Sequence, residues 1–186
     1  ETASYHYKCT IGRKHQVEVD IPFIVLSFSE MGLPNRVQAV VSICRSHEWG
    51  ALTRFLRSVY PRLVPILLSQ RELISSVKGL RASTGHSVQV RSYSAKARIG
   101  LPMTRQWKVK REWTDEELDQ VLLTVQDRHE VITSLDVVFF PRVGELSHIV
   151  PNAVCKIRKT GEIELDGNFR LAFEAVGAEV ARVGYK

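Results

Sequence analysis

Hydrophobic and polar residues alternate along the first part of the chain, in residues 5–9 and again in residues 17–21. Side chains on a strand point to alternate faces, so each stretch predicts a strand with one buried face. A polar, glycine-containing turn at residues 12–15 joins them, which predicts a β-hairpin. The β-branched stretch 37–44 predicts a third strand.

The spacing of apolar residues then changes to three and four, which is typical of a helix. Leu52, Phe55, Leu56 and Val59 follow this spacing, and Ser46 is the expected N-terminal cap.

Two further helices begin with a capping-box pattern, in which a serine or threonine precedes a glutamate by three residues. Ser69 with Glu72 begins one helix, and Thr114 with Glu117 begins the other. Asn168 is the expected cap of a last helix.

Between and after these helices, β-branched and aromatic residues predict further strands at 88–99, 105–113, 131–140, 153–157 and 162–165. The predicted element order is βββαα–ββαβββα. Strands and helices are grouped rather than strictly alternating, so the sequence predicts an α+β fold with mostly antiparallel sheets and about four helices.

The length of 186 residues suits a single domain, residues 1–186, or two lobes, residues 1–85 and 86–186. With 44% hydrophobic and 25% charged residues, the composition is that of a globular protein and excludes general disorder or a collagen. No apolar run approaches the ~20 residues of a membrane-spanning helix. The chain starts at Glu1 without a signal-peptide pattern, as expected of a fragment or a processed product.

The charge is distributed very unevenly along the chain. Residues 1–53 carry five basic and five acidic side chains, whereas residues 54–111 carry 13 basic side chains and one acid, Glu72. Residues 112–186 carry eight basic and 14 acidic side chains, which leaves a net charge of +6 for the whole chain. The central segment, at net +12, is expected to produce a local positive field.

The first central strand, 88–99, does not keep its basic residues on one face by simple alternation. An extra residue near Ser94 and Ala95, a β-bulge, would change the alternation so that the basic residues share the exposed face. The side chains then expected on that face are Arg91, Tyr93, Lys96 and Arg98.

Paired with the next strand, this face predicts a nucleic-acid interface. Basic side chains bind phosphates, and an exposed tyrosine stacks on an unpaired base. The candidate binding residues are Arg91, Tyr93, Lys96, Arg98, Arg105, Lys108, Lys110 and Arg111. The alternatives are an acidic protein partner or self-association in a larger assembly, and neutralisation of these residues by acids of the same chain. Lysine and arginine on strands also prevent edge-to-edge aggregation.

The sequence favours a non-enzymatic module without cofactor or metal. His47 and Glu48 begin a metalloprotease-like pattern, but Ala51 stands where the second histidine is needed. The acids that follow Thr114 are explained by helix capping and the helix dipole. A metal-dependent nuclease that uses scattered carboxylates, among them Asp136, is a third possibility.

Cys9, Cys44 and Cys155 are odd in number and lie far apart in the sequence. They predict reduced, buried thiols and therefore an intracellular, reducing compartment, with the cytoplasm as the default.

Overall fold

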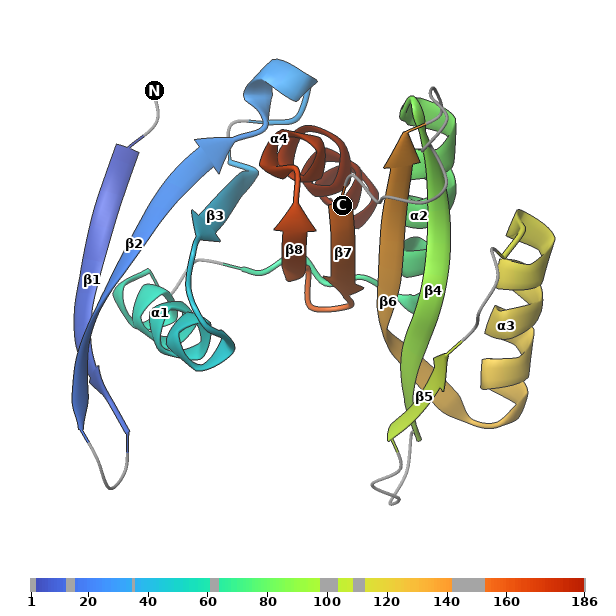
Figure 1. Cartoon of the computed structure of the whole chain (residues 1–186), viewed down its shortest axis with the longest axis horizontal. Helices are drawn as coiled ribbons and strands as arrows, with labels where there is room; N and C mark the ends of the chain where they lie inside the picture. The colour runs from blue at the N-terminus through green and yellow to red at the C-terminus, as the bar shows by residue number, and fades with distance from the viewer. Residues whose placement is uncertain are drawn as a thin grey trace. The chain divides into compact units, whose positions relative to one another are not determined.

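The structure is a computed structural model, and it folds into two compact units, Glu1–Pro65 and Ile66–Lys186 (Figure 1). The residues that it describes are 3–12, 16–34, 36–60, 64–97, 104–108, 113–141 and 153–185.

The N-terminal unit contains a three-stranded antiparallel sheet in the order β1-β2-β3. The predicted hairpin is confirmed, because Tyr7 lies opposite Ile21 in the register of β1 and β2. Its elements are β1 (Ala3–Ile11), β2 (Val17–Ser27), the short 3₁₀ helix η1 (Ser29–Met31), β3 (Gln38–Ser42) and α1 (Ser46–Val59).

Helix α1 packs its apolar stripe on this sheet. Leu52 and Leu56, one helical turn apart, form a core cluster with Ile21 and Phe23 of β2. The N-cap is Arg45 and not the predicted Ser46, which is the first helical residue. The carboxylate of Glu48 accepts a hydrogen bond from the backbone N–H of Arg45 at 2.7 Å. This contact from the third helical residue to the N-cap stabilises the N-terminus of α1.

The C-terminal unit contains a five-stranded antiparallel sheet in the order β5-β4-β6-β7-β8. Together with the N-terminal unit it reproduces the predicted order of strands and helices and confirms the α+β class. The elements are α2 (Gln70–Ser83), β4 (His86–Ala97), β5 (Thr104–Lys108), α3 (Asp115–Asp127), β6 (Glu130–Pro141), β7 (Ala153–Arg158), β8 (Ile163–Gly167), α4 (Phe169–Leu171), the π-helical segment η2 (Ala172–Gly177) and α5 (Ala178–Gly184).

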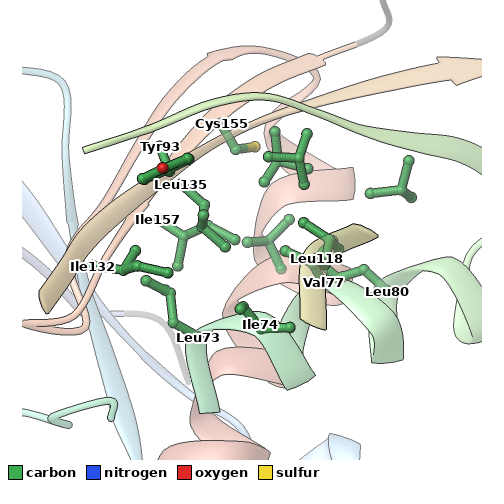
Figure 2. Close-up of a cluster of buried hydrophobic side chains, with 14 of the residues drawn as sticks. Leu73, Ile74, Val77, Leu80, Tyr93, Leu118, Ile132, Leu135, Cys155 and Ile157 are labelled. Carbon is green, nitrogen blue, oxygen red and sulfur yellow. The ribbon is translucent and has the colours of Figure 1, made fainter. Parts of the chain in front are cut away.

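The helices of this unit pack on one face of the sheet. One core cluster joins side chains of β4, β6 and β7 to Leu73 and Val77 of α2 and to Leu118 of α3 (Figure 2). Val180 of α5 belongs to the same cluster. Cys155 lies in the same cluster, and burial raises the pKa of its thiol to about 12. This cysteine is therefore a buried, unreactive thiol.

The predicted capping boxes are confirmed. Ser69 accepts a hydrogen bond from the backbone N–H of Glu72 at 3.3 Å, and the Glu72 carboxylate accepts one from the N–H of Ser69 at 2.7 Å. Thr114 and Glu117 make the same reciprocal pair at 3.3 and 3.0 Å. Asn168 accepts a bond from the N–H of Leu171 at 3.1 Å.

The division between the units falls between Pro65 and Ile66, earlier in the chain than the possible lobe boundary at residue 85. Helix α2 lies before residue 85 but shares its core with the strands that follow. The β7–β8 turn contacts the first residue of this unit. Gly161 has φ of +75°, and a Cβ atom built there would lie 2.4 Å from the carbonyl oxygen of Ile66. Only glycine fits this close approach without strain.

Candidate nucleic-acid interface

Strand β4 has one face in the core and one face directed away from it. Val88, Val90, Tyr93 and Ala95 belong to the core cluster. Two residues, Arg91 and Ser92, separate Val90 from Tyr93, so strict alternation is interrupted there. We call the face directed away from the core the outer face of β4; it is defined by Arg91, Ser92, Ser94 and Lys96.

A β-bulge causes this interruption, but its position differs from the predicted one. Val90 lies opposite Val137 and Ser92 opposite Asp136, so Arg91 is the extra residue of β4. The second irregularity, between Ser94 and Ala95, has its extra residue on β6 instead, because the partners move from Ser134 to Ile132. The predicted irregularity near Ser94 and Ala95 is therefore confirmed, but the extra residue of β4 itself is Arg91, three residues before Ser94.

The prediction that Tyr93 is exposed for base stacking is wrong. The bulge at Arg91 changes the alternation before Tyr93, so this side chain turns into the core and keeps only 6% of its surface exposed. Its ring centroid lies 5.7 Å from that of Trp113. Burial raises the pKa of the Tyr93 hydroxyl, and the negative charge of Glu130 adds to this effect.

Arg91 and Lys96 are exposed, as predicted. Neither has an ion pair with any residue in the described part of the chain. About 16 Å of strand separates them, at about 3.3 Å per residue. They are two separate positive charges on one strand, far enough apart for two different phosphates.

Strand β5 runs beside this region and contains two more of the predicted binding residues. Lys108 lies opposite Ser92 in the register, and Arg105 lies opposite Ala95. The side chains of both residues, and the whole of Arg98, Lys110 and Arg111, lie outside the described residues.

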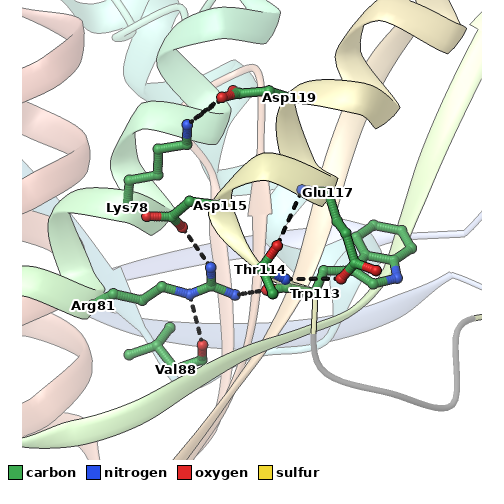
Figure 3. A network of polar contacts seen from close by, with 8 residues as sticks. All are labelled: Lys78, Arg81, Val88, Trp113, Thr114, Asp115, Glu117 and Asp119. Carbon is green, nitrogen blue, oxygen red and sulfur yellow. Dashed lines mark hydrogen bonds and ion pairs between the residues drawn. The ribbon is translucent and has the colours of Figure 1, made fainter.

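Two of the three basic residues of α2, Lys78 and Arg81, have a different environment, because they are paired within the unit. The Arg81 guanidinium donates hydrogen bonds to the carbonyl oxygen of Val88 at 3.0 Å, to the Asp115 carboxylate at 2.5 Å and to the carbonyl oxygen of Trp113 (Figure 3). The Lys78 ammonium contacts both carboxylate oxygens of Asp119 at 2.8 Å. For these two cations the alternative of pairing within the chain holds.

The same contacts explain the acids at the start of α3. Glu117 completes a capping box, and Asp115 and Asp119 hold the cations of α2. Hydrogen bonds from its own backbone N–H and from the Thr114 hydroxyl lower the pKa of the Glu116 carboxyl. Within the described residues there is no group of three or more histidine, cysteine or acidic side chains placed to hold a metal ion.

On the same side of the sheet, charged residues of β6, β7 and β8 compensate one another. The Ser92 hydroxyl donates a hydrogen bond to Asp136, whose other carboxylate oxygen lies 3.8 Å from the Lys156 ammonium. Arg158 pairs with Glu164 on β8, and its guanidinium also lies 3.7 Å from Glu162. Sequence reasoning missed the cross-strand contact of Ser92 with Asp136, because these residues are far apart in the chain and only the β4–β6 register brings them together.

The three cysteines are all free thiols in the structure. Cys155 is buried as predicted, whereas Cys9 and Cys44 are half-buried.

Comparison with protein-family models, with curated proteins and with solved structures found no match for this chain. Among the helices of the described residues, none combines the length and the apolar character that crossing a membrane would need.

Proposed function

We propose that the C-terminal unit binds nucleic acid through phosphate contacts at the outer face of β4. The observation that carries the proposal is the exposure of Arg91 and Lys96 without an ion pair to any described residue. In the neighbouring strand, Lys108 lies opposite Ser92 of this face. Basic side chains that neutralise phosphates release condensed counterions, which supplies most of the affinity that does not depend on sequence.

The burial of Tyr93 limits what this interface can read. An aromatic side chain on the exposed face of a sheet would stack on an unpaired base, but the ring of Tyr93 packs near Trp113 in the core instead. We therefore propose binding that is dominated by the phosphate backbone, falls steeply with salt and discriminates little between base sequences.

Fluorescence anisotropy with labelled 20-nucleotide single-stranded and double-stranded DNA and RNA tests this proposal at several salt concentrations. The double charge reversal Arg91→Glu with Lys96→Glu is expected to weaken binding about tenfold or more at low salt. The slope of log affinity against log salt should fall by about 1.5–2, since two phosphate contacts are lost. Unchanged affinity in this variant would exclude the outer face of β4 as the binding site.

A matched variant, Arg57→Glu with Arg71→Glu, changes the net charge by the same amount at exposed helix positions outside β4 that also have no ion pair with a described residue. It should keep most of the affinity. An equal loss in both variants would mean that total charge, rather than this face, attracts the nucleic acid.

A further inference from the structure

The N-terminal unit has a groove between strand β1 and helix α1. A cavity of about 540 Å³ opens in this groove. The residues that line it come from β1 and from α1, among them Tyr7 and Cys9 of β1 and Arg54, Phe55 and Ser58 of α1.

Strand β1 forms one edge of the three-stranded sheet and pairs only with β2 among the described strands. It is nine residues long and contains no proline. Alternate residues of such a strand direct their N–H and C=O groups away from the sheet, where another extended chain can pair with them. The length and regularity of β1 therefore suit the addition of a strand.

The cavity has an aromatic wall beside this edge. The rings of Tyr7 and Phe55 stack with their centroids 4.2 Å apart and their planes inclined by 16°. The Ser58 hydroxyl donates to the carbonyl oxygen of Phe55 at 2.7 Å. A pocket with an apolar wall beside an open strand edge can hold one side chain of an added strand while its backbone pairs with the edge.

The groove is positively charged on its helical side. Arg54 lines the cavity, and Arg57 lies three residues farther along α1; both are exposed. Neither has an ion pair with a described residue. The acid of β2 nearest to the middle of β1 in the register, Asp20, instead accepts a hydrogen bond from Nδ1 of His6 at 3.1 Å. The groove is therefore complementary to a negatively charged ligand.

We propose that this groove binds an extended acidic peptide segment of a partner protein. The segment adds to β1 as a further strand, places one apolar side chain against Tyr7 and Phe55, and brings a carboxylate to Arg54. A peptide fits better than a nucleic acid, because only a peptide backbone supplies the regular amide and carbonyl groups that the edge of β1 can pair with.

A defined pair of probes tests this inference by fluorescence anisotropy. The first is a labelled nine-residue peptide of alternating glutamate with threonine or valine and a central phenylalanine, and the second has lysine in place of every glutamate. The acidic peptide is expected to bind at least about tenfold more tightly, and Arg54→Glu should remove about tenfold of that affinity, the value of one ion pair of moderate strength. Equal binding of the two peptides, or no effect of Arg54→Glu, would overturn the proposal.

Control variants and hydrogen exchange of the backbone test whether the peptide binds in this groove. Arg71→Glu is a matched control that should leave peptide binding unchanged, and Arg91→Glu with Lys96→Glu should also leave it unchanged, so that the two proposed sites fail separately. Hydrogen exchange in residues 4–11 should slow when the acidic peptide binds, because the added strand protects the edge of β1. Unchanged exchange there, or binding of a labelled RNA strand that Arg54→Glu abolishes, would contradict strand addition by a peptide.

Discussion

Helix α2 and strand β4 are neighbours in the sequence and belong to one core, yet two basic residues of α2 and two of β4 have opposite environments. Lys78 and Arg81 of α2 are bound by acids and carbonyl groups of the same unit. Arg91 and Lys96 of β4 are exposed and without an ion pair to a described residue. The same formal charge is thus paired with groups of its own unit at Lys78 and Arg81, and has no described ion-pair partner at Arg91 and Lys96.

The difference shows that the net charge of a segment is not the charge of its surface. The segment 54–111 has a net charge of +12, but part of that charge is neutralised by the acids of α3, which follow it in the sequence. Helix α3 brings Asp115 and Asp119 to α2 because both helices pack on the same face of the sheet. The bulge at Arg91, in contrast, turns that side chain away from all of these partners.

A substitution of Tyr93 should have the largest effect on stability, because this residue lies between Arg91 and Lys96 in the sequence but on the opposite face of β4. Tyr93→Ala removes a buried aromatic side chain and should lower the free energy of unfolding by about 3–5 kcal/mol. Urea denaturation followed by tryptophan fluorescence measures this loss. Nucleic-acid affinity of the fraction that remains folded should be unchanged.

Tyr93→Phe keeps the ring and is the matched control. Its stability should stay within about 1.5 kcal/mol of the original protein. If Tyr93→Ala instead kept its stability and lost affinity, Tyr93 would belong to the binding surface, and the assignment of the two faces of β4 would be wrong.

Arg81 gives the next largest effect. Arg81→Met keeps much of the side-chain length but removes the charged donor that joins the carbonyl groups of Val88 and Trp113 to Asp115. Only 17% of the Arg81 side chain is exposed, so the lost contacts are mostly shielded from water. The free energy of unfolding should fall by about 2–3 kcal/mol, again measured in urea.

The same variant should change nucleic-acid affinity by less than about twofold, because this cation is already neutralised within the unit. A large loss of affinity with unchanged stability would place Arg81 on the binding surface beside Arg91 and remove the contrast between α2 and β4.

The local elements of the fold were predictable because their signals lie in adjacent residues. The capping boxes at Ser69 and Thr114 and the hairpin of β1 with β2 depend on short-range spacing, and the structure confirms all three. The order of strands and helices follows from the same local signals. Sequence reasoning therefore gave the α+β class correctly.

The interface was less predictable, because it depends on register between distant segments. Moving one bulge by three residues, from Ser94 to Arg91, is enough to turn Tyr93 from the exposed face into the core. The pairing of Lys78 with Asp119 links residues 41 positions apart, and local spacing carries no information about it. The sign of each charge can be read from the sequence, but the ion-pair partners of the basic residues can be identified only once the packing of α2 against α3 is known.

A substitution of Lys78 has the smallest expected effect on the free energy of unfolding, and it tests whether the two paired cations of α2 differ. Its ammonium contacts Asp119 at 2.8 Å, but 32% of the Lys78 side chain and 57% of the Asp119 side chain are exposed. Pairs this open to solvent contribute about 0–1 kcal/mol, so Lys78→Gln should lower the free energy of unfolding by less than about 1 kcal/mol. The loss should shrink further in about 1 M salt, where screening acts over about 3 Å, whereas the loss in Arg81→Met should persist, because its carbonyl contacts are partly buried. If both variants lost the same free energy of unfolding and responded equally to salt, the contacts of Arg81 would behave as surface ion pairs as well. The contrast between the partly buried Arg81 and the exposed Lys78 would then be wrong.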